Sequence, residues 1–115
     1  MIYAHGVSSD HAPVVLFAYR RPDHLTSALA SLSSNPAAKD TSLTIYCDGP
    51  KNPADTQLVE QTRAVAKSAQ GFRQLTVIER VENLGLAKSV ISGVTKALET
   101  SENVIVMEDD LVVST

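Results

Sequence analysis

The sequence predicts an α/β fold of three αβα layers around a mostly parallel four-stranded sheet, a Rossmann-like arrangement. Four short apolar runs, rich in β-branched and aromatic residues, alternate with three segments whose apolar residues recur at helical spacing. The apolar runs are continuous more than alternating, which is typical of strands buried on both faces. This order of strands and helices predicts parallel strands joined by right-handed crossovers, with helices on both faces.

The predicted strands are short and follow an N-terminal segment without any periodic pattern. They are Val14 to Tyr19, Leu43 to Cys47, Leu75 to Glu79 and Val104 to Met107. Residues 1–12 are mixed, small and polar, and we expect them to form a poorly ordered tail. The remaining residues, 13–115, are expected to form one domain, since a chain of 115 residues has the length of a single domain.

The three predicted helices each place apolar residues on one face. These residues are Leu25, Ala28, Leu29 and Leu32 in the first helix, Leu58, Val65, Ala66 and Ala69 in the second, and Ala87, Val90, Ile91, Val94, Ala97 and Leu98 in the third. Pro22 suits the first turn of the first helix. Asn52-Pro53 is a start signal for the second helix, and Gly71 is a stop signal for it.

The composition excludes several classes of protein. With 43% hydrophobic and 20% charged residues, the chain is expected to be globular. A net charge of -3 and the lack of a basic run argue against nucleic-acid binding. The lone Cys47 favours a reducing compartment, and no apolar stretch approaches the ~20 residues of a membrane span. We therefore expect a cytoplasmic protein. If the chain belongs to a longer parent protein, that protein could also associate with the inner face of a membrane.

Residues that follow the predicted strands are the candidates for a ligand site. In parallel sheets, ligands bind outside the carboxyl ends of the strands. The segments at these ends are Arg20-Arg21-Pro22, Asp48-Gly49-Pro50, Arg80 to Gly85 and Glu108-Asp109-Asp110. All four are expected at one edge of the sheet.

The acidic triplet Glu108-Asp109-Asp110 indicates a site for a divalent cation. Adjacent carboxylates repel one another unless a cation relieves them, and Mg²⁺ is commonly held by one or two carboxylates together with phosphate and water. A solvated acidic turn explains the same residues equally well.

Three other features have both a functional and an ordinary explanation. Asp48 can accept a hydrogen bond from a base N–H, although its position before Gly49 also suits a simple turn. Arg20 and Arg21 can pair with a diphosphate or a base edge, or form a solvated pair. Lys88 lies in the first turns of the third helix, and a helix N-terminus with a lysine can bind a phosphate. The alternative explanation is an ordinary connection between a loop and a helix. Motifs of P-loop and dinucleotide-binding proteins are absent from the sequence.

These segments, in this order, resemble the N-terminal half of GT-A fold glycosyltransferases. The likeness is strongest to family 2-like transferases and to the N-acetylglucosaminyltransferase I group, whose acidic motif is also Glu-Asp-Asp. It rests on Val14 to Pro22, Asp48-Gly49, Asn83 to Lys88 and Val104 to Asp110, and it covers roughly residues 13–113.

The resemblance implies a role for each candidate in binding a nucleoside-diphosphate sugar, with a UDP-sugar favoured. Tyr19, Arg20 and Arg21 would border the nucleotide, and Asp48 would bind its base. Lys88 would lie near the diphosphate or the sugar.

For the acidic triplet, the resemblance implies a metal site for Mn²⁺ or Mg²⁺. Asp110 would ligate the ion, with Asp109 as a further ligand. Glu108 and Asp109 would also lie around the ribose and the sugar.

The implied reaction is transfer of the sugar to a hydroxyl of a sugar or glycoconjugate acceptor, with inversion at the anomeric carbon. A metal would neutralise the charge on the leaving diphosphate, and a general base would deprotonate the acceptor. In the family that base comes from the C-terminal half, so we expect it beyond Thr115. The chain as given is accordingly expected to be an incomplete, inactive donor-binding portion.

Two other classes share parts of this pattern. A receiver-like signalling domain has a similar length and sheet, but it needs an acidic pair after its first strand, where this chain has Arg20 and Arg21. A nucleotidyltransferase shares the carboxylates at strand ends, but it usually has a glycine-rich loop after the first strand. Tyr19 to Pro22 is not such a loop.

Overall fold

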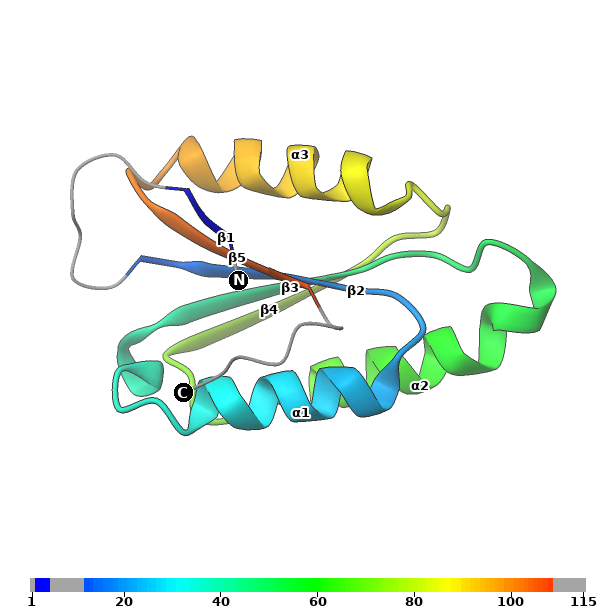
Figure 1. Ribbon diagram of the computed structural model, residues 1–115, viewed down its shortest axis with the longest axis horizontal. Coiled ribbons are helices and arrows are strands. Elements are labelled where there is room, and N and C mark those ends of the chain that lie inside the picture. The colour runs from blue at the N-terminus through cyan, green and yellow to red at the C-terminus, as the bar shows by residue number, and fades with distance from the viewer. Residues whose placement is uncertain (1, 5–11, 109–115) are drawn as a thin grey trace.

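The computed structural model describes residues 2–4 and 12–108, and it confirms the predicted α/β class. These residues form five strands and three α-helices, with two short 3₁₀ helices in the connections (Figure 1). In order they are β1 (Ile2–Ala4), β2 (Val14–Ala18), α1 (Pro22–Ser33), η1 (Ala38–Asp40), β3 (Ser42–Cys47), η2 (Pro53–Asp55), α2 (Thr56–Lys67), β4 (Gln74–Glu79), α3 (Leu86–Leu98) and β5 (Val104–Glu108).

The sheet has the strand order β1-β5-β2-β3-β4. The four predicted strands, β2 to β5, run parallel to one another. The additional strand β1 lies at the edge and pairs antiparallel with β5, with Ile2 opposite Val106. The residues of β1 fall inside the predicted tail of residues 1–12. Three residues are too few to show a period, and the strand is defined by its pairing with β5.

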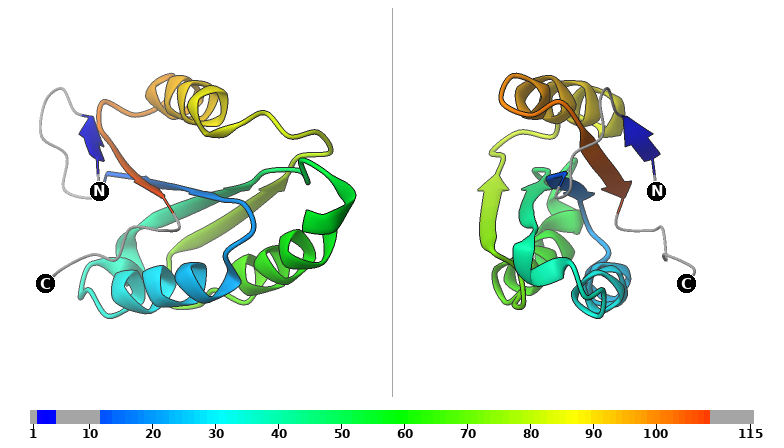
Figure 2. Two further views of the ribbon diagram at one scale, coloured as in Figure 1. Left: turned by 45° about the vertical axis from the view of Figure 1, so that its right-hand side comes forward. Right: turned by 90° about the vertical axis from the view of Figure 1, so that its left-hand side faces the viewer.

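Helices cover both faces of the sheet. Figure 1 shows α1 and α2 on one face and α3 on the other, and Figure 2 shows the same three layers from two further directions. Among the described helices, α1 and α2 pack side by side on one face and α3 is alone on the other, so the two faces are covered unequally. The predicted three-layer arrangement is thus confirmed.

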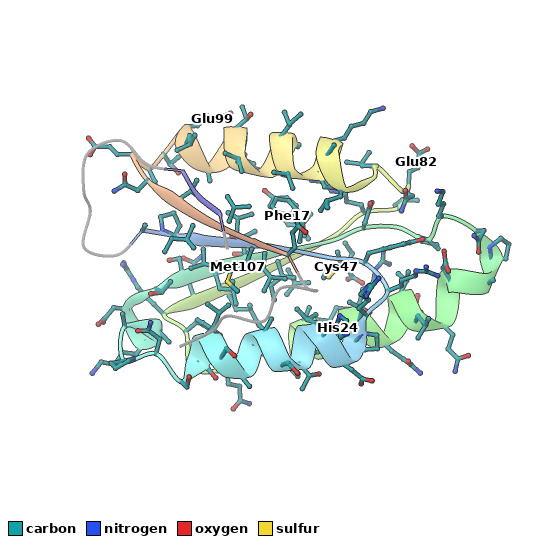
Figure 3. The ribbon with its side chains drawn as sticks, viewed as in Figure 1. Phe17, His24, Cys47, Glu82, Glu99 and Met107 are labelled. Atoms are coloured by element: carbon teal, nitrogen blue, oxygen red, sulfur yellow. The ribbon has the colours of Figure 1, made fainter. Side chains whose placement is uncertain are left out.

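The core lies in two clusters, one on each side of the sheet. On the side of α1 and α2, alternate residues of the strands pack against Leu25, Ala28 and Leu29. On the side of α3, residues such as Val15 and Phe17 of β2 pack against the helix. Figure 3 shows Phe17 between the sheet and α3, and Met107 and Cys47 on the opposite side. All five residues of β2 are buried, which explains why this strand is continuously apolar.

The buried face of α3 matches the predicted one only in part. Val90, Val94 and Ala97 pack against the core as predicted. The most buried residues of this helix are Ser89 and Gly93, whereas Ile91 is 67% exposed and Leu98 is 43% exposed. A Cβ atom at Gly93 would lie only 2.7 Å from Cζ of Phe17. The helix therefore approaches the sheet through its smallest residues, and this close approach turns part of the predicted apolar stripe towards solvent.

Candidate functional site

A pocket of about 290 Å³ lies at the carboxyl ends of β2, β3 and β5, on the side of the sheet that α3 covers. Strand register places Phe17 level with Tyr46 of β3 and with Glu108 of β5, and all three line the pocket. The rings of Phe17 and Tyr46 stack with their centroids 5.4 Å apart. The loop after β4 and the first turn of α3 complete the lining with Asn83, Gly85, Leu86 and Ser89.

Five of the predicted site residues meet at this pocket. They are Tyr19, Arg20, Arg21, Asp48 and Glu108. Lys88 is exposed on α3 and is not among the lining residues. The predicted metal ligands Asp109 and Asp110 lie outside the described residues.

Asp48 ties the end of β3 to the start of α3. Its side chain is only 7% exposed. Oδ1 accepts hydrogen bonds from the N–H groups of Gly49 and Leu84, each at 2.9 Å, and Oδ2 accepts one from Gly85 N–H at 3.0 Å. A carboxylate offers about four acceptor positions, so these bonds leave room for one more donor. Asp48 thus bonds the N–H of the next residue and also fixes a distant loop.

Two glycines allow this connection. A Cβ atom at Gly49 would lie 2.6 Å from the carbonyl oxygen of Val81, so only glycine fits beneath the loop after β4. Gly85 has a φ of 81°, a conformation that other residues rarely adopt, and it caps the N-terminus of α3. Asn83 adds a bond from its Nδ2 to the carbonyl oxygen of Gly49, at 2.9 Å. The position of the first turn of α3 is therefore set by β3.

A second buried carboxylate, Asp55, joins the loop after β2 to the loop after β3. Tyr19 Oη donates to Asp55 Oδ2 at 2.6 Å, and Arg20 Nη1 donates to Asp55 Oδ1 at 2.9 Å. The backbone N–H of Lys51 donates in turn to Tyr19 Oη at 2.9 Å. Tyr19 and Arg20 line the pocket, whereas Asp55 is not among the lining residues. Asp55 therefore positions two residues of the pocket lining through its hydrogen bonds.

The network around Asp55 also shifts two pKa values. The hydrogen bond from Tyr19 is the largest influence that holds the pKa of Asp55 below its ordinary value, and Arg20 adds to it. Burial and the bond to Asp55 raise the pKa of the Tyr19 phenol. Both shifts favour the pair as it stands, with Asp55 ionised and Tyr19 protonated.

Asp55 was not predicted as a site residue. The residue begins a helix after Asn52-Pro53, where an acid is expected to cap the helix N-terminus. In the structure Asp55 makes no such cap, and its carboxylate bonds side chains 35 and 36 residues away in the chain. Asp55 follows β3, and its arginine partner, Arg20, follows β2. Such a pairing depends on the tertiary structure, and spacing along the chain does not reveal it.

The charges at the pocket favour an anionic ligand with a cation. Arg20, Arg21 and Lys51 are exposed and line the pocket, while the charge of Asp48 is shared with three backbone donors. Arg20 uses one nitrogen for Asp55 and keeps further N–H donors for a ligand. Glu108 brings a carboxylate to the same pocket from the end of β5.

Glu108 is the part of the predicted metal site that the structure describes. A carboxylate beside cationic residues offers Mn²⁺ or Mg²⁺ a hard oxygen ligand at a place where a phosphate would also be held. Within residues 2–4 and 12–108, no three potential metal ligands cluster together. The metal site therefore stays a prediction that depends on Asp109 and Asp110.

Comparisons with known proteins give no independent assignment. No protein-family model matches the chain, and no significant match was found among curated proteins or solved structures. In the part of the chain that the structure describes, no helix has both the length and the apolar character needed to cross a membrane. The chemistry of the site is inferred from its geometry and from the motifs that surround it.

Proposed function

We propose that this chain is the donor-binding portion of a metal-dependent glycosyltransferase and that its pocket binds a nucleoside-diphosphate sugar. One observation carries the proposal: two arginines that follow β2 line the same pocket as a carboxylate at the end of β3, Asp48, and one at the end of β5, Glu108. This combination suits a diphosphate that is bound together with a divalent cation.

The nucleotide has complementary partners in the pocket. Arg20 and Arg21 offer forked donors to phosphate oxygens, and Lys51 adds a third positive charge. Asp48 retains acceptor capacity for a base N–H, which uracil supplies, and this favours a UDP-sugar. The volume of about 290 Å³ is at the lower end of the range for small-molecule sites, as expected if further residues complete the site around the sugar and the acceptor.

The proposed roles in transfer follow from these positions. Glu108, Asp109 and Asp110 would hold Mn²⁺ or Mg²⁺, which would neutralise the negative charge on the leaving diphosphate. Arg20 and Arg21 would orient the diphosphate, and Asp48 would hold the base, so that the sugar faces an acceptor hydroxyl. We assign the general base to no residue of this chain.

A thermal-shift titration tests the proposal. UDP with Mn²⁺ is expected to raise the Tm of the full chain, because a ligand that binds only the folded state stabilises it. Asp110→Ala should abolish the metal-dependent part of that rise, whereas Asp23→Ala, an exposed acid in the first turn of α1, should leave it unchanged.

The control ligands separate this proposal from its alternatives. Inorganic phosphate with Mg²⁺ should give a much smaller shift than UDP with Mn²⁺. If no nucleoside diphosphate changes the Tm with or without metal, the pocket is not a donor site. A response to Mg²⁺ and acetyl phosphate without a response to nucleotides would instead favour a receiver-like signalling domain.

A further inference from the structure

We infer that the first turn of α3, together with the Ser89 hydroxyl, forms a subsite for the diphosphate of the ligand. The inference deepens, and rests on, the proposed binding of a nucleoside-diphosphate sugar. It assigns part of phosphate recognition to protein groups that act without a metal.

The start of α3 presents unused hydrogen-bond donors. The first intrahelical bond runs from the Ser89 N–H to the Gly85 carbonyl oxygen at 3.1 Å. The N–H groups of Leu86, Ala87 and Lys88 precede it and have no acceptor within the helix. Among the described residues no side chain caps them, because Asp48 takes only the N–H groups before the helix.

Ser89 supplies the second, independent observation. Its side chain is 3% exposed and lines the pocket, yet its Oγ has no hydrogen-bond partner within the described part of the chain. A buried hydroxyl without a partner costs stability, and alanine at this position would fit the helix better. The hydroxyl is therefore positioned for an acceptor that the described residues do not supply.

A phosphate group meets the requirements of both features. Its oxygens accept hydrogen bonds only, which matches a serine hydroxyl and a row of backbone N–H groups, and the helix dipole favours negative charge at this end. Among the described residues that line the pocket, Arg20, Arg21 and Lys51 supply positive charge that an anion can pair with. Ser89 and Leu86 lie on the pocket side of α3, so the subsite opens into the same pocket as the arginines.

The test compares Ser89→Ala with Ser92→Ala, a change of the same kind at an exposed position of the same helix. Affinities for UDP and for uridine are measured by NMR titration of the full chain, in EDTA and in Mg²⁺. Ser89→Ala should weaken UDP binding by about tenfold, as expected for one hydrogen bond to a charged group, and leave uridine binding unchanged. Ser92→Ala should bind both like the native chain.

A titration of the native chain with inorganic pyrophosphate in EDTA gives a readout that does not depend on any variant. Pyrophosphate should shift the amide resonances of Leu86, Ala87 and Lys88. If UDP binds but these amides do not move and Ser89→Ala binds UDP normally, the subsite is refuted while the proposed function stands. If pyrophosphate moves the amides but no nucleotide or nucleoside binds, the anion subsite stands and the proposed function fails.

Discussion

Two buried carboxylates, Asp48 and Asp55, organise the candidate site at the level of single residues. Asp48 bonds backbone N–H groups and fixes a loop, whereas Asp55 bonds side chains and fixes Tyr19 and Arg20. Each connects segments that are far apart in the chain. In both cases a charge whose burial would otherwise be unfavourable is satisfied by several donors.

The pH dependence of stability reports on the Asp55 network. Because its pKa in the folded state lies below the ordinary value of 3.8, Asp55 stabilises the fold at pH values above about 3.8, and this stabilisation is lost as the pH falls through the lower folded pKa. Tyr19→Phe removes the largest cause of the shift, so the pKa of Asp55 should move up towards its ordinary value.

Carboxyl-carbon NMR titration of the native chain and of Tyr19→Phe measures this change directly. Tyr3→Phe, the same change at a tyrosine of β1, serves as the control. Urea unfolding should show that the difference in stability between Tyr19→Phe and the native chain shrinks on acidification. An equal pKa of Asp55 in both proteins would contradict the assigned network.

At the level of elements, the fold and the buried face of α1 were predictable, whereas the buried faces of α2 and α3 were predicted only in part. Strands β2 to β5 and the three helices lie where apolar runs and helical spacing placed them. The predicted face of α3 was right only in part: Val90, Val94 and Ala97 pack against the core, but the most buried positions are a serine and a glycine, which carry no apolar signal. In α2, likewise, Leu58 is 39% exposed while Thr62 is fully buried.

A substitution at Gly93 tests this explanation of how α3 packs. Alanine is normally better than glycine inside a helix by about 1 kcal/mol. Here the new Cβ would meet the Phe17 ring at 2.7 Å, so we expect Gly93→Ala to lower the free energy of unfolding by about 1–3 kcal/mol. Ser92→Ala on the exposed side should be neutral or slightly stabilising. Urea denaturation measures both, and a stabilised Gly93→Ala would show that α3 packs less closely.

For the whole molecule, the carboxyl edge of the parallel sheet is what made the site predictable. Parallel strands bring their carboxyl ends together, so residues after β2, β3 and β5 had to lie near one another whatever the details of packing. Positions that depend on tertiary contacts could not be derived in this way. Asp55 acts through partners on another loop, and Ser89 is defined by its burial and by its place at the pocket.

Paramagnetic broadening by Mn²⁺ tests the central claim most directly, because it reports both the ligand and the place where the metal binds. With UDP present, substoichiometric Mn²⁺ should broaden the amide signals of Glu108, Asp48 and Arg21, and signals at the opposite end of the sheet, such as that of Ser42, should stay sharp. Without UDP the broadening should be much weaker. Broadening that is independent of UDP, or that lies away from the pocket, would contradict a metal-dependent nucleotide-sugar site at this edge of the sheet.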